Sequence, residues 1–381
     1  MGAVCLTDTS YMKRIVLTIP QRMLLALLNA SLQGRAPETD VFDNATPSDW
    51  KACCDLAVKQ GVLALAWVGI VKLPKQQMPP QDLKIAWALA VEKYEGKYAY
   101  YCQVVAELAE LYQKHGIRMV QLKGVGLSTY YPCPRHREGG DIDIFTCSAD
   151  RNKLTDKEAH DLADKLMEEQ DIEVDYGHPK HSEWYYKGIP IENHITLLDV
   201  GIGELVQQAE GILRECMHPQ LVMLPTGKQI YIPSVEFNTL FVAFHTAQHY
   251  GHGLALHHLY DWACIIKQYG VRMPDGITDR HFLRGIDAMN YLCNSYLGTS
   301  VEVSRKGRRV AAEILEEIFE PYEGGEMPAR GLWKQLRFKA RRFVRMVRVN
   351  NTFFYTPLWR KAAFWQKIRK SIAWHLSMRW R

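Results

Sequence analysis

The stretch Asp141-Ile142-Asp143-Ile144-Phe145 constrains the fold more than any other part of this 381-residue chain. Polar and apolar residues alternate strictly through it, which is typical of a β-strand with one buried face. Asp141 and Asp143 therefore project from the same face, about 7 Å apart along the strand. A rigid strand holds two carboxylates this close chiefly where a divalent cation or a hydrogen-bond network neutralises them. The alternative is a solvated strand face, because D-x-D also occurs by chance.

Helical patterns flank this strand on both sides. Before it, the apolar spacing predicts helices over 21–32, from Ser48 as N-cap toward Gly61, over 62–73 and over 81–115. After it, everything from Val235 onward is predicted to be helical.

The middle of the chain has a different pattern, with short strands predicted over 117–122, 141–145, 172–176, 183–187 and 190–198. A helix starts near Gly124, and a charged helix is predicted over 153–170. We therefore expect an α+β fold. The expected division is an N-terminal helical region (1–115), a core (116–234), a C-terminal helical domain (235–326) and a basic, Trp-rich tail (327–381).

Two further segments bring chemistry to the Asp141 strand. Lys123-Gly124-Val125-Gly126 follows a predicted strand and opens a helix, where backbone N–H groups and a lysine can receive a phosphate. Alternation over 189–195 places Glu192 and His194 on the polar face of another strand. Three carboxylates, Asp141, Asp143 and Glu192, suit the binding of Mg²⁺ and the positioning of a triphosphate for in-line attack. The alternative third carboxylates are Glu173 and Asp175.

These residues resemble the uncharacterised nucleotidyltransferase family of the polymerase-beta-type superfamily. The segments that carry the resemblance are Leu122-Lys123-Gly124, Tyr131-Pro132, Arg137 and Gly140 to Ile144. Weaker similarities lie in Asp49-Trp50, Leu56-Ala57, Glu192-Asn193-His194, Phe244 to His249 and Tyr260-Asp261. The similarity thus spans residues from about 48 to 265.

The resemblance implies a small mixed sheet flanked by helices, with Asp141, Asp143 and Glu192 as catalytic residues that bind two Mg²⁺ (or Mn²⁺) ions. Glu192 would bind metal or act as general base. Lys123, Gly124, Arg137 and Gly140 would bind the nucleotide.

The implied reaction is transfer of a nucleoside monophosphate from an NTP, with ATP the expected donor, to an unidentified hydroxyl or phosphate acceptor, with release of pyrophosphate. The chain departs from the superfamily pattern at Lys123-Gly124, where Gly-Ser is common, and at Glu192, where Asp is more usual. These departures permit an alternative, a non-catalytic nucleotide-binding or antitoxin-like partner protein that retains the fold.

Histidines cluster near the start of the predicted C-terminal helical domain, where five of the 14 lie between residues 245 and 258. His245 and His249 have the i, i+4 spacing of a two-ligand metal site, but Gln248 replaces the Glu of H-E-x-x-H. We expect His245, His249 and Asp261 to form a polar network of the helical domain, and we expect His194, His245 and His249 to contact phosphate or acceptor. Buried, hydrogen-bonded histidines without a ligand are the alternative.

The formal charge of +5 hides two opposite segments. The tail from Met327 holds 15 Lys and Arg and no acidic residue, whereas the first 326 residues hold 32 basic and 42 acidic residues, a charge of −10. We expect the tail to contact its own acidic body, with an anionic membrane surface or nucleic acid as alternatives.

The cellular location is expected to be the cytoplasm. Nine cysteines, an odd number, without C-x-x-C spacing favour a reducing compartment. The apolar run from Ile15 to Leu32 is interrupted by Pro20-Gln21-Arg22, which makes it a poor signal peptide or membrane span.

Overall fold

The computed structural model describes residues 16–150, 153–198, 204–250, 253–319 and a few positions between 331 and 340. The described helices are α1 (Ile19–Gln33), α2 (Pro47–Lys59), α3 (Leu63–Ile70), α4 (Gln81–Lys114), α5 (Val125–Ser128), α6 (Asp156–Glu168), α7 (Glu204–Glu215), α8 (Val235–His249), α9 (Leu256–Tyr269), α10 (Arg280–Leu292) and α11 (Arg305–Phe319). The described strands are β1 (Ile117–Gln121), β2 (Ile142–Ser148), β3 (His181–Tyr186), β4 (Ile189–His194), β5 (Gln220–Met223) and β6 (Gln229–Ile232). No described helix is both long enough and apolar enough to cross a membrane.

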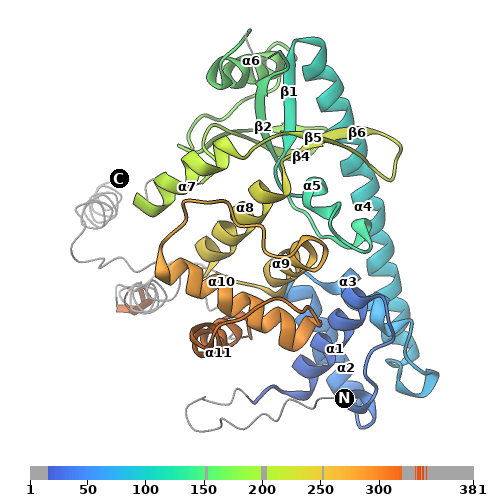
Figure 1. The fold of residues 1–381 in the computed structure, drawn as a ribbon. Helices are drawn as coiled ribbons and strands as arrows, with labels where there is room; N and C mark the ends of the chain where they lie inside the picture. The colour runs from blue at the N-terminus through green and yellow to red at the C-terminus, as the bar shows by residue number, and fades with distance from the viewer. Residues whose placement is uncertain are drawn as a thin grey trace.

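The six strands form one mixed sheet in the order β3-β4-β2-β1-β6-β5. The inner strands β2 and β4 are parallel, and so are β1 and β6, whereas the pairs β1 with β2, β3 with β4 and β5 with β6 are antiparallel. Mixed helix and sheet confirm the predicted α+β class (Figure 1). The parallel register sets Asp143 of β2 directly opposite Glu192 of β4, and this pairing positions the site described below.

Each face of the sheet carries its own hydrophobic core. On one face, Ile142 and Ile144 pack with apolar residues of α4 and α6. On the other face, Val120, Leu122 and Phe145 belong to a larger cluster that continues through α7 and α8 into the helical part of the chain. The long helix α4 runs beside both the sheet and the helices below it (Figure 1).

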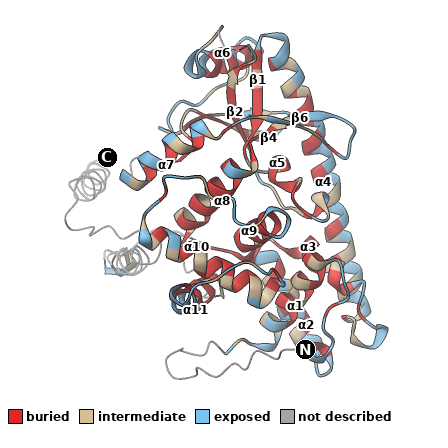
Figure 2. Cartoon of the chain, in the orientation of Figure 1, coloured by how far each residue is buried: buried red, intermediate tan, exposed pale blue. Residues whose placement is uncertain are grey.

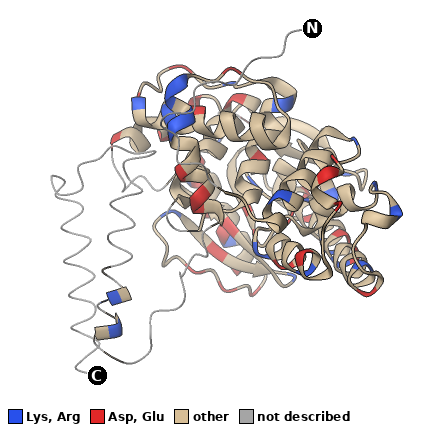
Figure 3. Ribbon diagram, turned by 90° about the horizontal axis from the view of Figure 1, so that it is seen from below, with Lys and Arg blue, Asp and Glu red and all other residues tan. Residues whose placement is uncertain are grey.

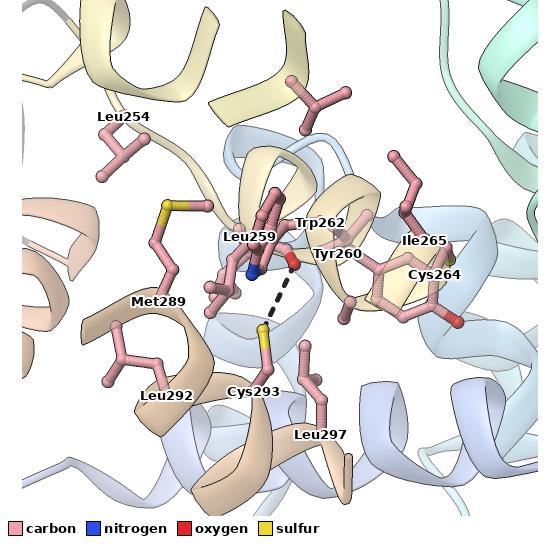
Figure 4. Packing of buried hydrophobic residues seen from close by; sticks show 14 of the residues in the cluster. Leu254, Leu259, Tyr260, Trp262, Cys264, Ile265, Met289, Leu292, Cys293 and Leu297 are labelled. Atoms are coloured by element: carbon pink, nitrogen blue, oxygen red, sulfur yellow. Dashed lines mark hydrogen bonds between the residues drawn. The ribbon is translucent and has the colours of Figure 1, made fainter. Parts of the chain in front are cut away.

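Helices α1 to α3 and α8 to α11 pack together on the same side of the sheet as α7 (Figure 1). Ten residues of α8 and ten of α9 are buried, so both helices lie largely inside the molecule (Figure 2). At their centre, Trp262 of α9 donates a hydrogen bond from Nε1 to Oδ1 of Asn290 on α10, at 2.9 Å. The Cys293 thiol lies 3.7 Å from the carbonyl of Leu259 (Figure 4). This packing holds α9 in a fixed position relative to α8 and α10.

Charged residues of both signs are spread over the described surface rather than separated into a basic and an acidic face (Figure 3). The expectation for the basic tail concerns residues 327–381, which lie almost entirely outside the described residues. The eight cysteines of the described part of the chain are free thiols.

Two predicted helix starts are shifted. The helix expected from Gln21 begins at Ile19, because Pro20 occupies the first turn, where its missing N–H costs nothing. The predicted N-cap Ser48 is wrong: Thr46 caps α2, and its hydroxyl accepts a hydrogen bond from the backbone N–H of Asp49. Pro47 then occupies the first helical position, which is why the cap lies two residues earlier.

The strand expected over 172–176 is also wrong, since only an isolated bridge between Asp175 and Glu183 forms there. Helix α7 and the hairpin of β5 and β6 were not predicted. β5 is largely exposed and does not alternate, and β6 alternates over only four residues, which is too short a pattern to predict a strand.

Candidate active site

Asp143 is the centre of the site. It lies on the inner strand β2 and is almost completely buried, at 1% exposure. Its Oδ1 lies 2.7 Å from Nζ of Lys123 and 3.0 Å from Nε2 of His194. Burial alone would raise the pKa of Asp143, but the charge of Lys123 and the hydrogen bond with His194 outweigh it and hold the pKa well below its usual value. Asp143 is therefore a carboxylate anion.

Glu192 faces Asp143 across the parallel pair of β2 and β4. Its Oε2 lies 3.4 Å from Nε2 of His194 and 3.7 Å from Nε2 of His181. Burial opposes the charge of Glu192, yet the interaction with His194 keeps its pKa below the usual value. One ligand atom each from Asp143, Glu192 and His194 lies within 4.8 Å of the others, a spacing that a single cation can bridge.

Asp141 precedes β2 and is half-buried. Burial, and next the negative charge of Asp143, raise its pKa, and Glu192 acts in the same direction. Asp141 thus feels the charges of Asp143 and Glu192, although the group whose ligand atoms lie within 4.8 Å of one another holds Asp143, Glu192 and His194 and not Asp141. The two aspartates differ: the pKa of Asp143 is lowered by its partners and that of Asp141 is raised by its neighbours.

The Lys123-Gly124 turn passes beside the start of β2. Gly124 has φ of 56° and ψ of −120°, which a residue with a side chain rarely adopts, and a Cβ there would lie 3.5 Å from the carbonyl oxygen of Asp141. Burial opposes the positive charge of Lys123, but Asp143 and Asp141 outweigh this effect and raise its pKa. Lys123 is thus a buried ammonium bound to the acidic group.

Arg137 is engaged with the helical part of the chain. Its guanidinium forms a two-pronged pair with Asp261 of α9, with N–O distances of 2.8 and 2.9 Å, and the Tyr131 hydroxyl donates to the same carboxylate. Its third nitrogen, Nη1, lies 3.3 Å from the carbonyl oxygen of Gly124. Arg137 therefore ties α9 to the glycine turn.

Gly140 immediately precedes Asp141 and is exposed. Its carbonyl accepts a hydrogen bond from the Tyr101 hydroxyl of α4, at 2.8 Å. The long helix thereby fixes the backbone that leads into the acidic strand.

His245 and His249 come together on α8, with ring centroids 4.5 Å apart. Burial, followed by the positive charge of Lys123, lowers the pKa of His245 well below its usual value. His245 thus lies within electrostatic reach of the acidic site, on the helical side of it.

Two candidate residues were not identified from the sequence. Glu183 of β3 is paired with Glu192, and on its other side Glu183 is paired with Asp175. Asp143, Glu192, Glu183 and Asp175 thus form a row of acidic residues across the sheet. His258 of α9 joins His245 and His249. The sequence of β3 does not alternate, so Glu183 is found only through the pairing of β3 with β4, and His258 only through the packing of α9 against α8. The alternative third carboxylate Asp175 lies three strand spacings from Asp143, about 14 Å, which is too far to share an ion with it.

The residues fit a divalent cation. The Asp143 Oδ2 oxygen is buried and has no hydrogen-bond partner among the described residues, which is costly unless a ligand occupies it. Carboxylate oxygens are the ligands that Mg²⁺ and Mn²⁺ prefer, and one imidazole nitrogen is compatible with Mn²⁺.

An acidic, cation-suited group beside a lysine-glycine turn on a mixed sheet is typical of proteins that handle nucleotide phosphates. The model of the uncharacterised nucleotidyltransferase family matches residues 46–299, and the chain belongs to this family. No curated protein and no solved structure is similar enough to the chain to count as a match. Membership supports a general nucleotidyl transfer function and an NTP as substrate.

Proposed function

We propose that this chain is a metal-dependent nucleotidyltransferase that moves a nucleoside monophosphate from an NTP, ATP in the first instance, to a hydroxyl or phosphate acceptor. The observation that carries the proposal is the pairing of Asp143 with Glu192 on adjacent strands, with an unpartnered buried oxygen on Asp143. Asp141, Asp143 and Glu192 would hold the Mg²⁺ or Mn²⁺ ions. When bound, these ions would neutralise the triphosphate and polarise its α-phosphoryl group.

The protein side chains would act on the reactants as follows. Lys123 and the backbone of Gly124 would contact the phosphates, and Arg137 would hold that turn through the Gly124 carbonyl. The acceptor oxygen attacks the α-phosphorus. The bond between the α-phosphorus and the oxygen that bridges it to the β-phosphate breaks, and pyrophosphate leaves. Glu192 would complete the metal-binding group or accept the acceptor's proton. His194 would orient Asp143 through Oδ1.

The ion pair of Lys123 and Asp143 has a consequence for this role. At 2.7 Å it occupies Oδ1 and leaves Oδ2 for an ion. Bound Mg-NTP would supply the triphosphate as a second anionic partner for Lys123, so the lysine can shift from Asp143 toward phosphate.

Pyrophosphate release tests the proposal. The full chain would be incubated with each NTP, Mg²⁺ and pooled acceptors, and compared with Asp143→Asn, Glu192→Gln and Asp175→Asn. The last is a matched control, because it lies on the same row of the sheet but beyond reach of the ion. We expect the first two variants to lose at least about 100-fold in rate, since metal stabilisation is worth several kcal/mol, and the control to match wild type.

The outcomes separate the two candidate classes. Binding of Mg-NTP without pyrophosphate release from any acceptor pool would favour the non-catalytic nucleotide-binding or antitoxin-like alternative. Equal turnover in wild type and Asp143→Asn would refute the assignment of the site.

A further inference from the structure

Three histidines converge between α8 and α9, apart from the acidic group. The ring centroids of His245 and His249 are 4.5 Å apart, and so are those of His249 and His258. The ring centroids of His245 and His258 are 5.4 Å apart. One ring nitrogen from each histidine lies within 4.8 Å of the others. No other group of three histidines this close is found among the described residues.

The surroundings of His245 and His258 favour neutral imidazoles, the form in which histidine binds a metal. Burial, and then the charge of Lys123, lower the pKa of His245, whereas burial and the charge of His257 lower that of His258. Two of the nearby cations have an anionic partner, because Lys123 is paired with Asp143 and Arg137 with Asp261. Lys180 is a further cation that lowers the pKa of His245.

His258 has an outer hydrogen-bond partner of the kind that metal-binding histidines use. Its Nδ1 lies 3.3 Å from the carbonyl oxygen of Ala255 and 3.1 Å from the Ala255 backbone nitrogen. The two contacts require opposite tautomers. Donation from Nδ1–H to the carbonyl leaves Nε2 with a lone pair for an ion, whereas acceptance from the backbone N–H leaves Nε2 protonated. A bound ion would select the tautomer in which Nδ1–H donates to the carbonyl of Ala255.

We propose that His245, His249 and His258 form a second metal site, which binds a zinc-type dication between α8 and α9 and leaves a fourth position for water or an anion. Three imidazole nitrogens favour Zn²⁺ over Mg²⁺, which prefers oxygen. Tetrahedral Zn–N bonds of about 2.05 Å place ligand nitrogens about 3.3 Å apart, so the rings close by no more than about 1.5 Å. The proposal is independent of nucleotidyl transfer.

The site has a chemical use because of where it lies. Lys123 influences His245, so an anion bound at the fourth position would be near the side of the core that we assign to phosphate. A zinc-bound water or phosphate oxygen would thus connect the two helices to the substrate side of the sheet.

Zinc binding by the untagged, EDTA-treated full chain tests this, measured by competition with a chromophoric chelator. We expect one tightly bound Zn²⁺, and a Co²⁺ form with the intense visible bands of tetrahedral coordination. His249→Ala and His258→Ala should each weaken zinc binding by at least about 100-fold, more than the loss of an outer hydrogen bond.

Two variants serve as controls. Glu192→Gln removes a ligand of the acidic group, and His115→Ala removes an exposed histidine at the end of α4, so both should bind zinc like wild type. Circular dichroism of the metal-free variants checks their folding. If His249→Ala and His258→Ala do not fold, the Co²⁺ spectrum of the wild-type chain alone decides whether a tetrahedral site is present.

Three results would overturn the proposal. The first is no zinc retained by wild type against the chelator, or a weak octahedral Co²⁺ spectrum. The second is zinc affinity that is lost in Glu192→Gln but kept in His249→Ala. The third is that the metal-free wild-type chain binds pyrophosphate and that His249→Ala and His258→Ala abolish this binding, because the histidines would then form an anion site.

Discussion

The pair of Arg137 and Asp261 allows a quantitative test of how the helical part is joined to the sheet. Both side chains are nearly buried, at 10% and 4% exposure, and the guanidinium makes two contacts below 3.0 Å. Replacing Asp261 with Asn leaves a buried guanidinium without its countercharge and weakens the acceptor of the Tyr131 hydroxyl. Breaking a buried pair on one side costs roughly 3–5 kcal/mol.

Urea unfolding measures this cost as the change in the free energy of unfolding. We expect Asp261→Asn to lose roughly 3–5 kcal/mol, and the double variant Arg137→Met/Asp261→Leu to recover much of the loss, because the apolar pair leaves no charge unpaired. Asp161→Asn, which breaks the exposed pair with Lys157, should unfold like wild type. A loss below about 1 kcal/mol in Asp261→Asn would refute the reasoning, since the buried guanidinium would then have found another partner or water.

Three further predictions concern local structure. Thr46→Ala should cost about 1 kcal/mol of stability in urea unfolding, whereas Ser48→Ala should cost almost nothing, because only Thr46 caps α2; equal losses would contradict the cap. Gly126→Ala should lower stability by roughly 1–3 kcal/mol, because its Cβ would lie 2.7 Å from the carbonyl oxygen of Gln121; an unchanged melting temperature would argue against this close packing. Burial raises the pKa of Glu138 from 4.5 to about 7, so the native state binds the proton more tightly and stability falls as pH rises from 4.5 through 7. Between pH 5 and pH 8, the free energy of unfolding of Glu138→Gln should fall by roughly 2–3 kcal/mol less than that of wild type. The same pH dependence in the variant and in wild type would contradict this prediction.

Periodicity alone predicted the elements that have long, regular patterns. The helix expected over 81–115 from its helical spacing corresponds to α4. The strand expected over 117–122 from a short apolar run corresponds to β1, and the strand expected over 141–145 from alternation corresponds to β2. The segment 172–176 alternates equally well but forms only one bridge, since alternation does not supply a partner strand.

The sequence indicated candidate residues for the site but not their geometry. The sequence indicated Asp141, Asp143 and Glu192 through alternation, yet the register that sets Asp143 opposite Glu192 depends on pairing between distant segments. Arg137 could not be placed, because its partner Asp261 lies on a helix 124 positions further along the chain. Such contacts are determined by tertiary packing rather than by local pattern.

The most direct test of the central claim is the affinity of the full chain for Mn²⁺ with a non-hydrolysable ATP analogue, measured by calorimetry. If Asp143 and Glu192 hold the metal, Asp143→Asn and Glu192→Gln should each weaken binding by more than about 10-fold, because each removes an anionic ligand. Asp175→Asn should bind like wild type. Equal affinity in wild type, Asp143→Asn and Glu192→Gln would contradict the account.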